Sequence, residues 1–102
     1  MVLAEFAMFP TDKGESVSSY VAMVIDVIDR SGITYQLTPM GTILEGTWDE
    51  VFRVIGDCFK ALEKVSSRIN TSIKVDYRAG DATRMHSKID KIQNVLGRDV
   101  RH

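Results

Sequence analysis

Hydrophobic and polar residues follow two periods along the chain, and the changes of period mark the predicted elements. Residues 2–9 are almost continuously apolar and are closed by Pro10, which has no backbone N–H for a sheet, so they predict a first strand. Apolar and polar residues alternate strictly over 33–38 and over 72–78, and each of these segments predicts a strand. Residues 42–45 follow a Pro-Met-Gly turn and predict the second strand of a hairpin.

Three other segments place apolar residues three and four positions apart, which is the spacing of one helix face. The first runs from 16 to 30 and ends before Gly32, which can supply a left-handed cap. The second follows Thr47, which forms the capping-box pattern with Glu50, and a short third helix is predicted within 83–96. The first two helix faces are predicted to hold Val17, Tyr20, Val21, Val24, Val27 and Ile28, and Val51, Phe52, Ile55, Phe59, Leu62 and Val65.

The resulting order of elements is β-α-β-β-α-β with one extra C-terminal helix. This order predicts a ferredoxin-like α+β sandwich, in which a four-stranded antiparallel sheet carries two helices on one face. With 102 residues, the chain is expected to form a single domain over 1–102.

The first predicted strand is apolar on both of its sides, so the sheet is expected to be hydrophobic on the face that lacks helices. Monomers rarely tolerate a large exposed apolar patch, and we therefore expect a homodimer or homotetramer in which further copies cover this face. The alternative is that the C-terminal helix folds back over the patch within one chain. The two sides of the strand are Val2, Ala4, Phe6 and Met8, and Leu3, Glu5, Ala7 and Phe9.

Composition narrows the range of partners. The net charge is −1, which provides no general attraction to nucleic acid or to an anionic membrane. No apolar run approaches the roughly 18 residues of a membrane-spanning helix, and the N-terminus lacks a basic leader. The single cysteine, Cys58, fits a reducing compartment. We expect a cytoplasmic protein that binds neither nucleic acid nor membrane.

Signatures of catalysis are missing from the sequence. It contains no phosphate-binding glycine loop, no dinucleotide fingerprint, and no cysteine or histidine pair at metal-ligand spacing. Cys58 is interpreted as a packing residue, and His86 as an exposed or half-buried helix residue, while His102 ends the chain. We expect no enzyme, no metal and no cofactor.

Polar side chains on the predicted strands are the better candidates for a site. Glu5 lies among apolar neighbours, and burying its carboxylate without a partner would cost several kcal/mol. Its partner is either a strand neighbour, Lys74 or Arg78, or the amine of a ligand. The same alternatives apply to Glu45, Asp76, Thr38 and Thr42.

Three stretches resemble the small thiamine-binding protein family of bacteria, archaea and yeast: TPMGTILEG across the hairpin, the helix start from Trp48 to Phe59, and IKVDYRAG in the last strand. The similarity extends from Val2 to about Leu96. It implies the ferredoxin-like fold, a tetramer, and binding of thiamine or its hydroxymethylpyrimidine portion. The implied role is that of a carrier, buffer or sensor. The alternative is a homo-oligomeric regulatory module that binds another small metabolite between subunits.

The resemblance also implies where the ligand lies. It places the site at the hairpin, and we extend the predicted site to the first loop and the start of the first helix. In that loop the sequence FPTDKGE differs from the leucine-glycine step that follows the proline in many relatives. Thiamine combines an aminopyrimidine, which needs hydrogen-bond partners and an apolar wall, with a cationic thiazolium, which favours a carboxylate or an aromatic ring. The predicted ligand-binding residues are Thr38, Gly41, Thr42, Glu45, Glu5, Phe9, Thr11 and Ser18.

Overall fold

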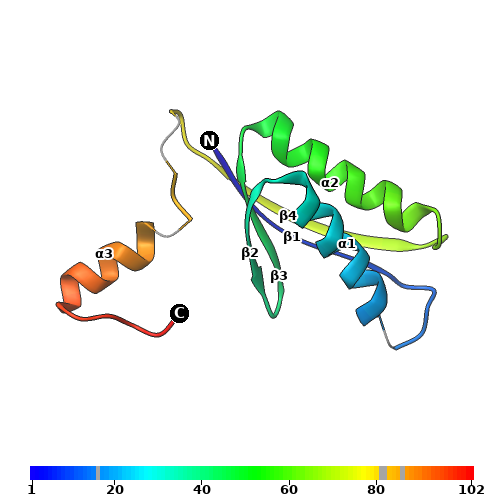
Figure 1. Ribbon diagram of the computed structural model, residues 1–102, viewed down its shortest axis with the longest axis horizontal. Helices are drawn as coiled ribbons and strands as arrows, with labels where there is room; N and C mark the ends of the chain where they lie inside the picture. The colour runs from blue at the N-terminus through cyan, green and yellow to red at the C-terminus, as the bar shows by residue number, and fades with distance from the viewer. Residues whose placement is uncertain (16, 81–82, 86) are drawn as a thin grey trace.

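The computed structural model describes residues 1–15, 17–80, 83–85 and 87–102 (Figure 1). Its body is a layer of two helices on a four-stranded sheet, and a third helix follows the last strand. The elements in chain order are β1 (Val2–Pro10), α1 (Ser18–Ser31), β2 (Thr34–Thr38), β3 (Gly41–Gly46), α2 (Trp48–Glu63), β4 (Ile69–Tyr77) and α3 (Ser87–Leu96).

The sheet has the strand order β2-β3-β1-β4, and every neighbouring pair is antiparallel. The central strand β1 pairs with β3 only from Val2 to Phe6, whereas it pairs with β4 along its whole length to Pro10. Both α1 and α2 lie on the same face of this sheet (Figure 1). The predicted ferredoxin-like fold with an added C-terminal helix is confirmed.

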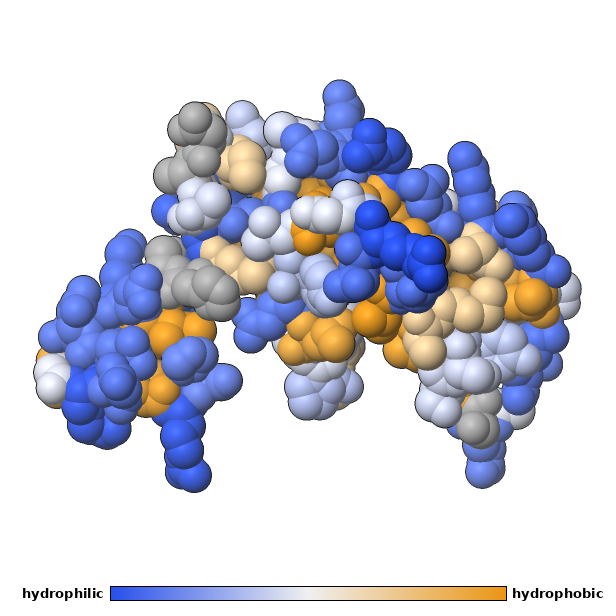
Figure 2. Space-filling model, in the orientation of Figure 1, coloured by the Kyte–Doolittle hydropathy of each residue, from blue (hydrophilic) through white to orange (hydrophobic). Residues whose placement is uncertain are grey.

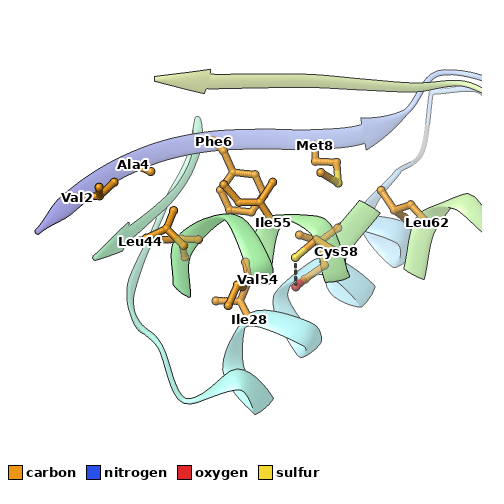
Figure 3. Packing of buried hydrophobic residues seen from close by; sticks show 12 residues of the cluster. Val2, Ala4, Phe6, Met8, Ile28, Leu44, Val54, Ile55, Cys58 and Leu62 are labelled. Carbon is orange, nitrogen blue, oxygen red and sulfur yellow. Dashed lines mark hydrogen bonds between the residues drawn. The ribbon is translucent and has the colours of Figure 1, made fainter. Parts of the chain in front are cut away.

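The hydrophobic core lies between this sheet face and the two helices (Figure 3). Even-numbered residues of β1 point into it because side chains alternate along a strand. Full burial of an aliphatic or aromatic side chain stabilises the fold by about 1.5–3 kcal/mol. The core consists of Val2, Ala4, Phe6, Met8, Val24, Ile28, Leu44, Val51, Val54, Ile55, Cys58 and Leu62.

Local signals set the helix ends as predicted. Gly32 ends α1 with φ of 78°, a left-handed conformation that glycine adopts without steric cost. At the start of α2 the Thr47 hydroxyl accepts a hydrogen bond of 3.2 Å from the Glu50 N–H. The predicted start of the first helix at Ser16 lies outside the described residues. Across the described ranges, no helix combines the length and the hydropathy that crossing a membrane requires.

The buried face of α2 differs from the predicted one. Val54 and Cys58 are buried, while Phe59 and Val65 are each 41% exposed. The stripe that meets the sheet therefore passes through Cys58, one residue earlier than the predicted Phe59. The assignment of Phe59 to this face was wrong because only large apolar residues were counted at helical spacing. Cys58 was interpreted as a packing residue but was not placed on the stripe, although a free thiol packs as a small hydrophobic group.

The face without helices is mixed in character and not apolar throughout. Leu3, Ala7 and Phe9 of β1 do lie on it, together with Ile43 of β3. The neighbouring strands contribute polar side chains at the same level, which the alternation of β1 alone could not show. The expectation of a sheet hydrophobic on both faces is corrected: the two central strands place Glu5 and Glu45 among the apolar residues of this face, and the outer strands give it polar edges. These edge residues are Thr34, Gln36, Thr38, Asn70, Ser72, Lys74 and Asp76.

The C-terminal helix does not fold back onto this face. Figure 1 shows α3 to one side of the sandwich, clear of α1 and α2. The segment that leads to it does reach the open face, because the Arg84 N–H donates to a carboxylate oxygen of Glu45 over 2.6 Å. The covering of the open face by α3 of the same chain is therefore not observed.

Candidate ligand-binding site

A cavity of about 400 Å³ lies between the first half of α1, the tip of the β2–β3 hairpin and the end of β1. This volume falls in the range of small-molecule sites, which is about 300–1,000 Å³. The lining residues are Phe6, Ala7, Met8, Phe9, Val17, Val21, Val24, Ile25, Leu37, Thr38, Pro39, Met40, Gly41 and Thr42.

Unequal strand lengths create this cavity. The pairing of β1 with β3 ends at Phe6 opposite Thr42, since the hairpin turns at Pro39 and Met40. β1 nevertheless continues to Pro10 against β4. Beyond Phe6 one edge of β1 thus has no neighbouring strand, and α1 lies over the vacant position.

The walls of the cavity are apolar and contain no ionisable side chain among the described lining residues. The Thr42 side chain is buried and belongs to the helical side of β3. The Thr38 hydroxyl serves the turn, because it donates to the Gly41 carbonyl over 2.9 Å and accepts from the Met40 N–H over 3.3 Å. Such a site favours a flat, uncharged group with few polar contacts.

Four of the predicted ligand-binding residues line this cavity: Thr38, Gly41, Thr42 and Phe9. Their part in binding stays a prediction. The sequence analysis missed the contribution of Val21, Val24 and Ile25 of α1 and of Val17, the N-cap residue just before it. Val21 was assigned to the core, but it is 37% exposed and borders the cavity. A helix stripe alone does not distinguish a side chain that meets a core from one that meets a cavity.

Glu5 lies on the other face of the sheet, in a smaller hollow of about 160 Å³. This hollow shares Phe6, Ala7 and Met40 with the cavity, so the two adjoin at the hairpin tip. Lys74 stands opposite Glu5 in the β1–β4 register, yet no ion pair joins Glu5 to Lys74 or Arg78 within the described part of the chain. The carboxylate is exposed and close to the rim of the cavity.

Glu45 is engaged elsewhere. It is buried on the open face, where it accepts the hydrogen bond from the Arg84 N–H. The Arg84 guanidinium in turn donates to the carboxylate and the backbone carbonyl of Asp76. Glu45 and Asp76 together hold the segment after β4 against the sheet, and neither lines the cavity.

Thr11 and Ser18 also lie outside the cavity. The backbone N–H of Thr11 donates to the Arg68 carbonyl over 2.8 Å, which extends the β1–β4 ladder by one residue. Ser18 begins α1 and borders a shallow depression with Asp29 and Tyr35. There the Tyr35 hydroxyl donates to Asp29 over 2.8 Å, and this bond raises the pKa of the tyrosine.

A profile of protein families matches residues 4–93, and its description is "Thiamine-binding protein". The chain belongs to the thiamine-binding protein family. Among curated relatives, the UPF0045 protein Mb1933 of Mycobacterium bovis is 35% identical over 93% of this chain and 94% of its own length. The UPF0045 protein YqgV of Bacillus subtilis is 34% identical over 94% of this chain and 98% of its own length.

Solved structures share the architecture of this chain. A hypothetical protein of Methanocaldococcus jannaschii superposes with a TM-score of 0.81 at 31% identity, covering 89% of this chain and 94% of its own. A Thermotoga maritima protein, named for a provisional role in thiamine biosynthesis or salvage, gives 0.78 at 23% identity over 89% and 97% of the two chains. At that identity the second likeness supports the fold alone.

Cys58 has the environment of a packing residue, as predicted. Its thiol donates toward the Val24 carbonyl over 3.7 Å within the core (Figure 3). Burial, and to a lesser extent the charge of Asp57, raises the pKa of the thiol to about 12, so the thiol stays protonated at neutral pH. His86 falls outside the described residues. Within the described ranges, no group of three potential metal-ligating side chains occurs.

Proposed function

We propose that this protein is a non-catalytic cytoplasmic binding protein for thiamine or its hydroxymethylpyrimidine portion, and that it acts as a carrier, buffer or sensor. The ligand lies in the cavity between α1 and the hairpin tip. The observation that carries the proposal is the cavity itself: it has the volume of a small-molecule site in a chain of the thiamine-binding protein family.

The uncharged walls favour the pyrimidine half of the ligand as the buried part. A neutral aminopyrimidine loses little hydration energy on entering an apolar cavity, provided that its polar edge finds hydrogen-bond partners. Phe6, Met8 and Val24 supply apolar surface around such a ring. A permanent cation inside the same space would meet no counter-charge among the side chains that the structure describes around the cavity.

The thiazolium half therefore belongs at the rim. Phe9 is 37% exposed there and offers an aromatic ring, which attracts cations through its negative face. Glu5 lies in the adjoining hollow and offers a carboxylate. Because Lys74 stands opposite Glu5, part of that carboxylate's attraction is offset in the free protein.

We further propose that the working form is a homodimer or homotetramer. α3 has only ten residues, and an isolated helix shorter than about 12 residues is marginal in water. Ile92 and Leu96 lie four positions apart on α3 and are 42% and 49% exposed. Figure 2 shows hydrophobic side chains gathered on one side of this helix. A second copy that packs against this side would supply the missing stabilisation.

Calorimetry with thiamine and with hydroxymethylpyrimidine tests the function. We expect saturable heat, and a thermal shift that corresponds to about 2.7 kcal/mol when the ligand is at 100 times its dissociation constant. Absence of both signals at millimolar concentrations of the two ligands would show that the proposed function is wrong.

A matched pair of substitutions on α1 tests the location. Val21→Trp should fill the cavity and weaken thiamine binding at least about tenfold, which is about 1.4 kcal/mol. Ala22→Trp adds a larger side chain at the next, exposed position, which does not line the cavity, and should leave binding unchanged. Equal affinities for the two variants would place the ligand elsewhere.

A further inference from the structure

The two edges of β1 differ beyond Phe6. Toward β4 the pairing is continuous to Pro10 opposite Ile69, and toward β3 it stops at Phe6 opposite Thr42. The cavity is lined by the consecutive residues 6–9, whose side chains alternate between the two faces of the sheet. Consecutive residues can line one cavity only if the edge of the strand itself borders it.

Hydrogen bonds at both ends of β1 fix the direction of its backbone groups. The Thr11 N–H donates to the Arg68 carbonyl over 2.8 Å, and the Met1 carbonyl accepts from the Arg78 N–H over 3.1 Å. Odd-numbered residues of β1 thus direct their N–H and C=O toward β4. In an antiparallel ladder these directions alternate, so even-numbered residues direct theirs toward β3 and its vacant continuation.

The approach of Gly41 agrees with this direction. A side-chain carbon at Gly41 would lie 2.7 Å from the carbonyl oxygen of Phe6, so that carbonyl faces the β3 edge. Two residues further along β1, the N–H and C=O of Met8 face the same way, at a level where no strand continues. Pro10 has no N–H. Within residues 7–10, Met8 alone therefore turns both a donor and an acceptor to the cavity.

We propose that the backbone N–H and C=O of Met8 recognise the amino edge of a 4-aminopyrimidine in this cavity. The ring nitrogen accepts from the Met8 N–H, and the exocyclic amine donates to the Met8 carbonyl. This inference rests on the proposed function and specifies that the protein recognises the amino edge of the pyrimidine. Buried backbone groups are almost always paired, so a ligand that pairs with both is favoured over an apolar one of equal shape.

The short length of the free edge selects a heterocycle over a peptide strand. A peptide that extends a sheet needs several consecutive hydrogen-bonding residues on the edge. Here the edge runs only from Ala7 to Pro10 and is closed by proline. The described residues of the cavity wall also include no basic side chain, so a phosphate group on the ligand would have to remain outside it.

Amide NMR of the ¹⁵N-labelled full chain tests the proposal on the unmodified protein. Thiamine and the neutral 4-amino-2,5-dimethylpyrimidine should both shift the Met8 amide resonance saturably and slow its hydrogen exchange at least about tenfold. The amides of Ala7 and Phe9, which face β4 in the ladder, serve as internal controls and should keep their exchange rates. The analogue 4′-deaminothiamine lacks the donor and should bind at least about tenfold more weakly than thiamine.

The outcomes separate this inference from the proposed function. Thiamine binding without a change at the Met8 amide, or with equal affinity for the deamino analogue, would overturn the backbone recognition and leave the function standing. A Met8 response to the neutral aminopyrimidine without thiamine binding would support the recognition and refute thiamine as the ligand. If neither compound is bound, both proposals are wrong.

Discussion

On the helical face of the sheet, the even-numbered side chains of β1 from Val2 to Met8 are at most 5% exposed, and residues of the same chain cover them. On the opposite face, the odd-numbered side chains from Leu3 to Phe9 are half-buried or exposed, although they come from the same nine-residue strand. The first face is closed by local packing of α1 and α2. The second receives from its own chain the short segment around Arg84, which bonds to Glu45 and Asp76.

This difference indicates a division of roles between the faces. A closely packed face that contains a cavity is suited to holding a small ligand in a fixed orientation. A face with a hydrophobic centre and polar edges resembles a protein interface more than a ligand site. This division agrees with our proposal, in which the ligand lies on the helical side and a partner subunit contacts the other side and α3.

The largest expected effect concerns the closed face. Leu44 is fully buried between β3 and the helices, so Leu44→Ala should lower the free energy of unfolding by about 2–5 kcal/mol. Leu37→Ala on β2 removes the same atoms from a side chain that is 52% exposed, and should cost less than about 1 kcal/mol. Urea denaturation of both variants measures the contrast. Similar costs would mean that the burial of Leu44 between β3 and the helices contributes little to stability.

A smaller effect is expected at α3, on the side of the molecule that we propose contacts a partner subunit. Ile92→Asp places a charge on the hydrophobic side of α3 and should raise the dissociation constant of the oligomer at least about tenfold, or about 1.4 kcal/mol. Asn94→Asp adds the same charge at an exposed polar position of this helix and serves as the control. Sedimentation velocity over a concentration series distinguishes the two. A wild-type protein that stays monomeric at high concentration would contradict the proposed assembly.

Sequence alone predicted those features that depend on neighbouring residues. Gly32 and Thr47 mark helix ends because each acts on the backbone within a few residues of itself. The sequence of β1 separated its residues into two sides, but because both sides are largely apolar it did not show which one is buried. Cys58 was predicted as a packing residue, but its place on the buried stripe of α2 was not predicted, because small residues carry weak periodicity.

Features that depend on register could not be predicted in this way. The cavity exists because β3 ends its pairing at Thr42 while β1 continues to Pro10, and no local pattern gives the relative lengths of paired strands. Glu45 was proposed for the ligand, yet it is buried by a contact with Arg84, 39 residues away. A carboxylate at a strand end gives no indication of which distant segment will reach it.

The smallest effect tests how the end of β1 beside the cavity is held. Asp12 accepts hydrogen bonds from the Ser66 hydroxyl at 2.6 Å and from the Ser67 N–H and hydroxyl, both at 2.9 Å. The bond from Ser66, followed by that from the Ser67 backbone, lowers the pKa of Asp12.

A lowered folded-state pKa means that the ionised carboxylate favours the fold above its unfolded pKa of about 3.9, and that this contribution is lost as the pH falls below that value. Asp12→Asn should therefore lower the melting temperature slightly at pH 7, and the difference from wild type should shrink below about pH 4. Asp99→Asn, at an exposed position near the C-terminus, should show no such pH-dependent difference. A constant difference from pH 7 to pH 2 would mean that the charge of Asp12 does not stabilise the end of β1. The hydrogen bond from Thr11 to Arg68, which continues the β1–β4 ladder, would then be enough to hold it.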